Sequence, residues 1–238
     1  MGRNNRSIVA MGLLAGMLAL GACARENPED EIAEALPPQS YGEEGANVEL
    51  WLDTMEIGSR ELYSARTNVV DALDLKSGER IADIGAGTGL YTILFANEVG
   101  DAGAVFAVDI EPRFLKLINQ RAADLDFSNV ISVLGRDVSI TLPENDVDVV
   151  FISDTYNYFE DPQALMTSVF SSLKPGGRLI ILDFDLKDGA PRNADNQHIR
   201  VGKIALTQEV ESVGFVLEED VAVDGLTETY MLRFRKPG

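Results

Sequence analysis

The sequence is poor in the side chains from which covalent cross-links and metal sites are built. Its 238 residues include one cysteine and one histidine. A single cysteine excludes a disulfide within the chain and a metal site made of several cysteines. The lone histidine, His198, argues against a zinc site with imidazole ligands. We therefore expect no bound metal.

Positive charge is also scarce. The chain has 20 Lys and Arg residues against 39 Asp and Glu residues, a formal net charge of -19. Such a chain repels phosphate backbones and anionic lipid head groups, so nucleic acid is not an expected partner. The remaining composition, 45% hydrophobic and 25% charged, is ordinary for a soluble globular protein and sufficient for one domain with a full core.

The N-terminus has the layout of a secretory signal. Arg3 and Arg6 precede an apolar run over residues 8–20 that is too short to span a membrane comfortably. The sequence Leu-Gly-Ala-Cys at 20–23 resembles the lipobox of bacterial lipoproteins. This resemblance implies removal of residues 1–22 and acylation of Cys23. The alternatives are an ordinary signal peptide and an uncleaved anchor.

The residues after Cys23 suit an anchored protein. Residues 23–47 are acidic, carry few large apolar side chains and contain Pro37 and Pro38, so we interpret them as a tether. The lipoprotein resemblance, with Ala24 rather than Asp after the lipid site, implies the periplasmic side of the outer membrane in a Gram-negative host. Two or more acyl chains would hold the protein there firmly.

From residue 48 onward, short apolar runs alternate with helix-like segments. Near-continuous apolar runs are typical of strands covered on both faces, and the alternation predicts an α/β fold with a doubly wound, mostly parallel sheet of seven strands. The last two strands lie close enough to form an antiparallel hairpin. The predicted strands are 80–85, 104–110, 130–135, 147–154, 178–185, 214–223 and 227–236; the predicted helices are 90–99, 112–125, 162–173 and 201–213.

Residues 48–75 form a helical extension to the predicted domain, 48–238. Two amphipathic stretches are interrupted near Gly58. They lie either over the ligand crevice or against the sheet edge.

Three glycines follow the first strand in the sequence IADIGAGTGLYT. Gly85, Gly87 and Gly89 are spaced i, i+2 and i+4, whereas a dinucleotide-binding turn has its third glycine at i+5, which is Leu90 here. A phosphate-binding P-loop would end in Gly-Lys-Ser or Gly-Lys-Thr, which is absent. The turn therefore permits close approach of a ligand to the backbone without a dedicated pyrophosphate site.

Acidic residues at successive strand ends suit a cationic nucleoside better than a pyrophosphate. Asp109 ends the second strand, where a carboxylate accepts hydrogen bonds from both hydroxyls of a ribose. Asp83 ends the first strand and is placed to meet a ligand ammonium group. Asp137 follows the third strand, within reach of an adenine amino group.

Four ordered motifs resemble those of class I S-adenosylmethionine-dependent methyltransferases: DIGAGTGLYT, AVDIEP, LPENDVDVVFISDTYNYFEDP and LKPGGRLIILDFD. The terminal hairpin also matches that family. The resemblance covers residues 60–238 and implies S-adenosylmethionine as cofactor, lying over residues 85–89. It implies the ribose on Asp109, with Ile110 beside it, and the adenine near Asp137 and Val138.

Methyl transfer from a sulfonium requires alignment more than a fixed catalytic set. The candidates after the fourth strand are Asp154, to steer the donor or acceptor, and Tyr156, to line the acceptor pocket. Packing is the alternative for both tyrosines here and the expected role of Tyr158. Some relatives carry a histidine pair where Asn157 and Tyr158 stand, so an imidazole base is either absent here or placed elsewhere.

A second candidate region is DGAPRNADNQHIRVGK, after the fifth strand. It brings His198, Arg200 and Lys203 together, either as a site for an anionic acceptor with His198 as base or as a capped helix whose cations pair with nearby acids. Asp183 and Asp185 end the fifth strand and could contact the acceptor.

These features predict an exported, lipid-anchored methyltransferase acting on a small molecule, lipid or protein of the cell envelope. The alternative from another class is a lipoprotein that binds an adenosyl ligand without turnover. A nicotinamide-dependent dehydrogenase is disfavoured by Leu90.

Overall fold

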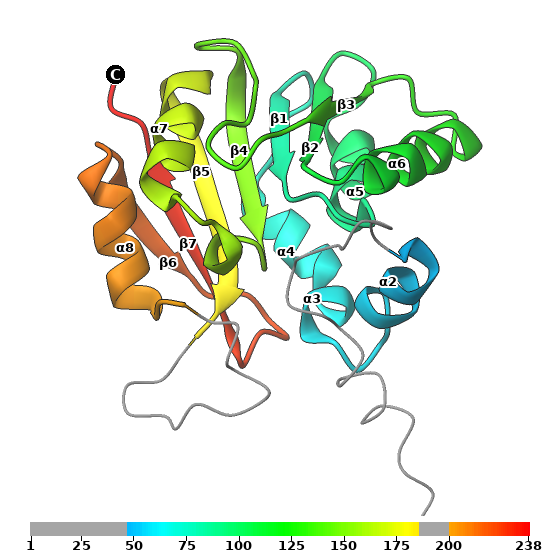
Figure 1. Ribbon diagram of the computed structural model, residues 1–238, viewed down its shortest axis with the longest axis horizontal. Coiled ribbons are helices and arrows are strands. Elements are labelled where there is room, and N and C mark those ends of the chain that lie inside the picture. The colour runs from blue at the N-terminus through cyan, green and yellow to red at the C-terminus, as the bar shows by residue number, and fades with distance from the viewer. Residues whose placement is uncertain (1–46, 186–199) are drawn as a thin grey trace, which may run out of the picture. The chain divides into compact units, whose positions relative to one another are not determined.

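Seven strands form one sheet in the computed structural model, which describes residues 47–185 and 200–238 (Figure 1). Their order is β3-β2-β1-β4-β5-β7-β6, with β1 to β5 parallel and β7 antiparallel to both of its neighbours. The predicted doubly wound fold with a terminal hairpin is confirmed. The strands are β1 (Arg80–Ile84), β2 (Ala104–Asp109), β3 (Val130–Leu134), β4 (Val147–Ser153), β5 (Leu173–Phe184), β6 (Val216–Val221) and β7 (Thr229–Arg235).

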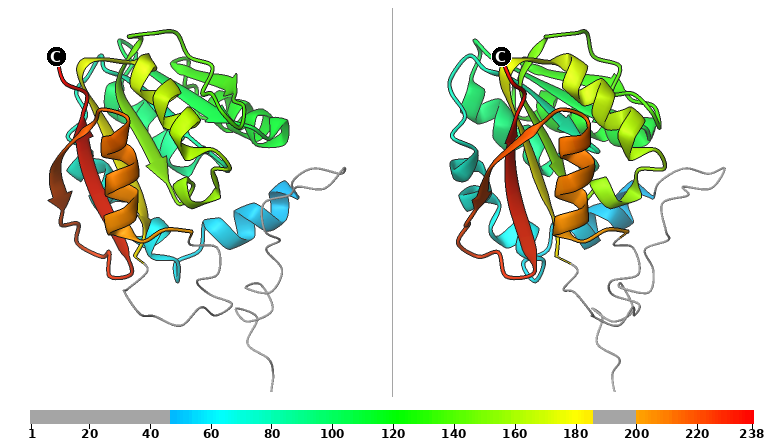
Figure 2. Two further views of the ribbon diagram at one scale, coloured as in Figure 1. Left: turned by 60° about the vertical axis from the view of Figure 1, so that its left-hand side comes forward. Right: turned by 90° about the vertical axis from the view of Figure 1, so that its left-hand side faces the viewer.

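Helices cover both faces of the sheet (Figure 2). One face packs on α4 (Arg66–Leu73), α5 (Leu90–Val99) and α6 (Pro112–Asp124), and the other on α7 (Pro162–Ser172) and α8 (Lys203–Ser212). Because both faces are covered, all six residues of β2 are buried, whereas edge strand β3 is partly exposed.

The helix boundaries follow from local sequence. Pro112 and Pro162 begin α6 and α7, where a missing N–H is tolerated. The preceding acids cap these helices: the Glu111 carboxylate accepts from the Arg113 N–H, and the Asp161 carboxylate accepts from the Ala164 N–H. These ends lie within two residues of the predicted ones.

The fifth strand begins earlier than predicted. β5 pairs with β4 at Leu173, and the register then shifts so that pairing continues from Arg178. Residues 174–177, predicted as a helix-ending turn, therefore form an irregularity inside the strand.

Two further helices precede the sheet: α2 (Val48–Met55) and α3 (Glu61–Ser64). Trp51 of α2 packs edge-to-face on Phe114 of α6, with ring centroids 5.7 Å apart. Leu62 of α3 and Leu73 of α4 are buried in the core beside the sheet. The N-terminal extension is thus built into the domain through both α6 and the sheet face.

The Glu61 carboxylate joins α3 to the terminal hairpin. It accepts hydrogen bonds from the Thr227 N–H at 2.8 Å and the Thr229 hydroxyl at 2.6 Å. The Glu228 N–H also donates to it. One carboxylate therefore holds the residues at the start of β7 against α3.

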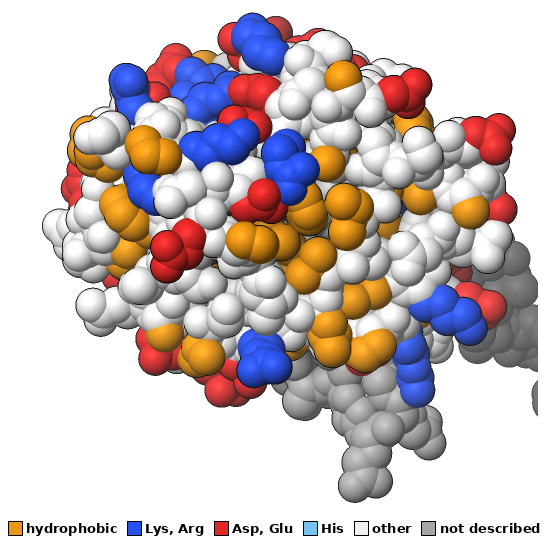
Figure 3. Space-filling model, turned by 90° about the horizontal axis from the view of Figure 1, so that it is seen from above, with side chains coloured by type: hydrophobic (Ala, Val, Ile, Leu, Met, Phe, Trp, Pro, Cys, Tyr) orange, Lys and Arg blue, Asp and Glu red, His pale blue; other side chains and the backbone are white. Residues whose placement is uncertain are grey.

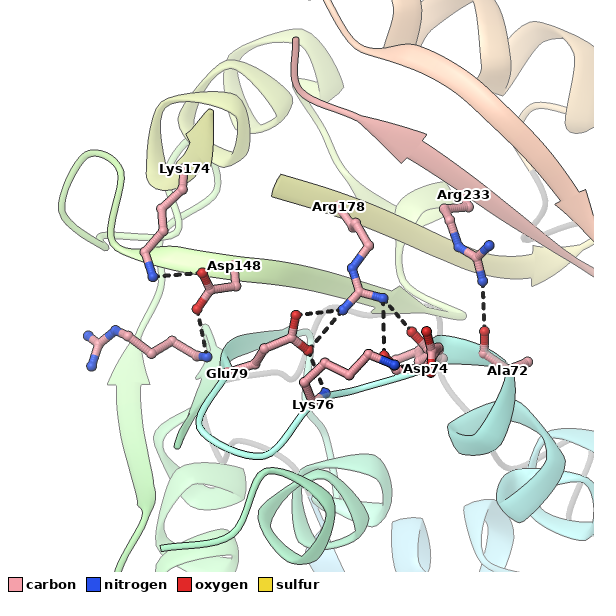
Figure 4. A network of polar contacts seen from close by, with 10 residues as sticks. Ala72, Asp74, Lys76, Glu79, Asp148, Lys174, Arg178 and Arg233 are labelled. Atoms are coloured by element: carbon pink, nitrogen blue, oxygen red, sulfur yellow. Dashed lines mark hydrogen bonds and ion pairs between the residues drawn. The ribbon is translucent and has the colours of Figure 1, made fainter. Parts of the chain in front are cut away.

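Ion pairs tie the elements together at the amino ends of the parallel strands (Figure 4). Arg178 binds Glu79 through two contacts of 2.8 Å and donates to the Leu73 carbonyl oxygen at 2.6 Å. Lys174 pairs with Asp148 at 2.7 Å. Figure 3 views this end of the molecule, where Lys and Arg side chains gather with Asp and Glu among them. We interpret the charges here as structural because they pair with one another.

Within residues 47–185 and 200–238, no helix is long and apolar enough to cross a membrane. The predicted leader and most of the tether lie outside the described residues.

Candidate functional site

A pocket opens at the carboxyl ends of β1, β2 and β4, with part of its wall supplied by the N-terminal helices. It brings together the glycine turn and the acidic strand ends that the sequence indicated. Its lining comprises Trp51, Met55, Arg60, Asp83, Ile84, Gly85, Ala86, Gly87, Thr88, Leu90, Tyr91, Val108, Asp109, Ile110, Phe114, Gly135, Arg136, Asp137, Ser139, Ile140, Ser153, Asp154, Thr155, Tyr158, Phe159, Glu160 and Leu165.

The three glycines of the turn serve different purposes. All have left-handed φ values, +69° at Gly85, +52° at Gly87 and +81° at Gly89. A Cβ at Gly85 would overlap the Thr155 side chain, and one at Gly89 would lie 2.7 Å from Ile118. A Cβ at Gly87 would have only the Gly85 carbonyl oxygen within 4 Å, at 3.8 Å. Gly85 and Gly89 therefore allow the fold to pack, whereas Gly87 leaves space for a ligand.

The Asp109 carboxylate holds the glycine turn and can still accept further hydrogen bonds. Its carboxylate accepts from the Gly87 N–H at 2.8 Å and from the Glu111 N–H at 2.9 Å, one bond to each oxygen. A carboxylate offers about four lone-pair sites, so sites remain for ribose hydroxyls. The side chain is buried, and burial raises the pKa of Asp109.

Asp83 lies beside it at the end of β1. It accepts a hydrogen bond of 2.6 Å from the Thr92 hydroxyl. Burial, with a smaller contribution from the Asp109 charge, raises the pKa of Asp83 to about 7. Within the described part of the chain, neither carboxylate belongs to an ion pair. A cationic ligand would therefore favour the ionised form of both.

The side of the pocket next to β3 contains one of the two residues expected near the adenine and the residue expected beside the ribose. Ile110 is 49% exposed and lines the pocket, and so does Asp137. Val138 is half-exposed and is not among the lining residues. Three features together fit an adenosyl group: the backbone without a side chain at Gly87, the remaining lone pairs of the Asp109 carboxylate, and the exposed apolar side chain of Ile110.

The other end of the pocket is organised around Asp154. Its carboxylate pairs with Arg60, which reaches it from the segment before α3. Asp154 has a left-handed φ of +48°, and its N–H donates to the Leu182 carbonyl oxygen at 2.9 Å. A non-glycine residue in this conformation is costly, and such strain clusters at functional sites. Asp154 therefore stands where it was predicted, with an arginine partner that was not predicted.

The structure reverses the expected positions of the two tyrosines. Tyr156 is fully buried, and its hydroxyl donates to Glu209 at 2.9 Å, so it does not line the pocket as predicted. Tyr158, expected to pack, does line it. Both belong to a 3₁₀ turn, in which residues two apart face different sides. Burial, helped by the charges of Asp154 and Asp183, raises the pKa of Tyr158 and keeps its hydroxyl protonated.

Asp183 lies outside the pocket lining. Its Oδ1 accepts from the Asn157 side-chain amide at 3.0 Å and from the Phe184 N–H at 2.8 Å, whereas Oδ2 has no hydrogen-bond partner. Burial, with a further contribution from the charge of Asp154, raises the pKa of Asp183 to about 7. The Asn157 amide oxygen in turn accepts from the Arg200 N–H at 2.8 Å. Asp183 is therefore bonded to the segment that follows β4 and does not line the pocket.

The cations after β5 are paired with neighbouring acids. Arg200 binds Glu209 at 2.8 Å, and Lys203 pairs with Asp220. This agrees with the structural alternative for these two residues. His198 lies outside the described residues, and Asp185 is exposed.

The N-terminal helices supply part of the pocket wall, which is one of the two placements that the sequence left open, but sequence reasoning did not identify the side chains that they contribute. Trp51, Met55 and Arg60 line the pocket but lie far from the strand-end motifs in the sequence. Their amphipathic pattern predicts a helix without indicating which side chains face a ligand. Within the described residues, no group of three or more His, Cys, Asp or Glu side chains is arranged to hold a metal ion.

Comparison with known proteins identifies the chemistry of this pocket. A family described as a methyltransferase domain matches residues 75–223. The chain belongs to this methyltransferase family. It is a class I S-adenosylmethionine-dependent methyltransferase, and S-adenosylmethionine is its methyl donor. Family membership thus favours the enzyme over the non-catalytic binding protein.

Individual relatives agree with this assignment. The methyltransferase is 29% identical over 188 residues to the ubiquinone/menaquinone biosynthesis C-methyltransferase UbiE of Cronobacter sakazakii, covering 76% of this chain and 72% of that protein. It is 28% identical over 202 residues to the UbiE protein of Yersinia pestis, covering 82% and 77%. The crystal structure of a methyltransferase from Aquifex aeolicus shares its fold, with a TM-score of 0.67, 22% identity and coverage of 78% and 96%.

Proposed function

We propose that this methyltransferase is a lipid-anchored enzyme of the cell envelope and that its acceptor is a small apolar molecule or a lipid. The observation that carries the proposal is the apolar wall of the pocket. Aromatic and aliphatic side chains from three parts of the chain supply it: Trp51, Met55, Phe114, Phe159 and Leu165. Such a wall favours an apolar acceptor by removing its surface from water.

The names of the sequence relatives support a carbon acceptor on a molecule of this kind. The UbiE proteins are described as C-methyltransferases of ubiquinone and menaquinone biosynthesis. The identity of 28–29% leaves room for a different acceptor, so we take from these relatives only the chemical class.

The proposed division of labour follows from the pocket. S-adenosylmethionine supplies a methyl group that its positive sulfonium has already activated. The Asp154 carboxylate accepts the proton that the acceptor loses when its new bond to the methyl carbon forms. Arg60 pairs with the Asp154 carboxylate and orients it, and the protonated Tyr158 hydroxyl donates a hydrogen bond to an acceptor oxygen. The apolar wall excludes water and orients the acceptor.

Transfer of a labelled methyl group tests this function. The full chain, solubilised in detergent, is incubated with methyl-labelled S-adenosylmethionine and an envelope extract, which is then separated into lipid and protein fractions. We expect label in the lipid fraction and a loss of about 10²-fold or more with Asp154→Asn, the range for a proton-transfer group. Label confined to the protein fraction, or undiminished transfer by the variant, contradicts the proposal.

The anchor has its own test. Replacing Cys23 with Ser removes the thiol that acylation requires, so the Cys23→Ser protein is expected in the soluble fraction after cell lysis while the unaltered chain sediments with membranes. Metabolic labelling with a fatty acid provides the second readout. If the variant still sediments with membranes, the anchor is an uncleaved leader or a docking partner.

A further inference from the structure

Arg121, on α6, connects the cofactor turn with the N-terminal helix α2. Its guanidinium donates to the Thr88 carbonyl oxygen at 2.8 Å. The same group pairs with both carboxylate oxygens of Glu56, the residue that follows α2. The side chains of Arg121 and Glu56 are 26% and 16% exposed, so this pair is partly shielded from water.

The Thr88 contact acts on the most conformationally permissive part of the pocket. Thr88 lies between Gly87 and Gly89, which lack a Cβ atom and therefore leave the turn with little intrinsic preference for one conformation. Asp109 accepts from the Gly87 N–H on one side of the turn, and Arg121 donates to the Thr88 carbonyl on the other. The turn is thus held from two sides.

The Glu56 contact acts on a wall of the same pocket. Trp51 and Met55 of α2 line the pocket, and Arg60 beyond α2 pairs with Asp154. The α2 helix lies against α6 rather than on the sheet, chiefly through Trp51 on Phe114. The Glu56–Arg121 pair therefore fixes the C-terminal end of α2, a helix that lines the pocket but does not pack on the sheet.

We propose that Arg121 is a positioning residue that couples the seating of α2 to the conformation of the cofactor turn. Since one guanidinium contacts both, a ligand that orders the turn also strengthens the seating of α2. By thermodynamic reciprocity, a seated α2 strengthens ligand binding. This role of Arg121 depends on the methyl donor that the family uses and not on the proposed acceptor, so an error in the acceptor would leave it unaffected.

Trp51 provides a direct reporter because it is the only tryptophan in the chain. Acrylamide quenching of its fluorescence measures how closely α2 is seated, and calorimetry with S-adenosylhomocysteine measures binding without turnover. In the unaltered full chain, saturating S-adenosylhomocysteine is expected to lower the quenching constant. Glu56→Gln removes the charge but preserves the shape of the side chain. It is expected to raise the quenching constant of the free protein and to weaken S-adenosylhomocysteine binding about 3- to 10-fold.

The chain offers a matched control in Glu79, whose carboxylate is 20% exposed and pairs with Arg178 at the opposite end of the sheet (Figure 4). Glu79→Gln makes the same chemical change in a similar ion pair. We expect it to lower thermal stability while leaving both the Trp51 quenching constant and S-adenosylhomocysteine binding unchanged.

Arg121→Lys completes the test because a lysine keeps the charge but lacks the planar fork needed to bridge two partners. It is expected to weaken S-adenosylhomocysteine binding as much as Glu56→Gln does. The double variant is expected to have a dissociation constant within about 2-fold of that of the single variant with the lower affinity. The proposal is overturned if the two single effects multiply in the double variant. It is also overturned if Glu56→Gln alters quenching and binding no more than Glu79→Gln, or alters one without the other.

Discussion

At the scale of single residues, the pocket combines carboxylates whose pKa is raised by burial with a turn that contains three glycines. Asp83 and Asp109 are buried at adjacent strand ends, and both line the pocket together with the glycine turn. A cationic adenosyl donor compensates the charge of both acids and fits against the bare backbone. The same residues would be a liability without such a ligand, because buried carboxylates disfavour the folded state when they ionise.

The ribose assignment gives the first prediction. Asp109→Ala should weaken S-adenosylhomocysteine binding by about 1–3 kcal/mol, since it removes the acceptor for the sugar and leaves the Gly87 N–H unpaired. Isothermal titration calorimetry measures this. Asp146→Ala, which removes an ion-pair partner of Arg80 remote from the pocket, is the control. Equal affinity of the Asp109 variant and the unaltered chain would mean that the ribose lies elsewhere.

The glycines give a second prediction, in which two similar substitutions have different consequences. Gly87→Ala places a methyl group in open ligand space, so it should reduce S-adenosylhomocysteine affinity about tenfold or more and cost about 1–2 kcal/mol of folding stability from its positive φ. Gly89→Ala meets Ile118 and should cost a further 1–3 kcal/mol or so through overpacking. Calorimetry and thermal unfolding separate the two effects. A Gly87 variant that binds normally would contradict the proposed ligand position.

At the scale of helices and strands, sequence periodicity predicted the sheet and its covering helices well. β1 and β2 are buried on both faces, so their apolar runs stand out against the flanking polar residues. The positions of side chains in the connections were less predictable. Tyr156 and Tyr158 exchanged their expected roles because a 3₁₀ turn follows β4, and Arg60 reaches Asp154 from 94 residues away in the sequence. No local pattern encodes such a contact.

The link between α3 and the terminal hairpin gives the third prediction. Burial alone would raise the pKa of Glu61, but hydrogen bonds from Thr229, Thr227 and Glu228 outweigh burial and lower it. Its contribution to stability is therefore present at neutral pH and is lost as pH falls through the lowered pKa. Glu61→Gln should reduce the free energy of unfolding by about 1–3 kcal/mol at pH 7, measured in urea.

The pH dependence of the stability lost in the Glu61→Gln variant tests whether the carboxylate charge is its cause. The difference between the unaltered chain and the Glu61→Gln variant should shrink below about pH 4, where Glu61 itself becomes protonated. A difference that stays constant with pH would indicate that the substitution acts through packing rather than through the carboxylate charge.

At the scale of the whole molecule, two buried carboxyl groups make the stability of the fold depend on pH. Asp83 and Asp183 both have pKa values raised to about 7 from a usual value of 3.8. Between these two values the folded chain holds protons that the unfolded chain has lost. The contribution of these two residues to stability is therefore present at low pH and falls as pH rises from about 4 to about 7.

This sign gives the fourth prediction. Asn at either position cannot ionise, so Asp83→Asn and Asp183→Asn should each flatten the decline in unfolding temperature between about pH 4 and pH 7 in the absence of ligand. Thermal unfolding of the free protein at several pH values measures the slope. A steeper decline in either variant than in the unaltered chain would contradict the raised pKa of that residue.

The crystal structure of the full chain with S-adenosylhomocysteine is the most direct test of how this enzyme holds its donor. We expect both ribose hydroxyls within hydrogen-bond distance of the Asp109 carboxylate and the adenosyl group against the backbone at Gly87. A sugar placed away from Asp109, or a pocket filled by the protein's own side chains, would contradict the site described for this methyltransferase.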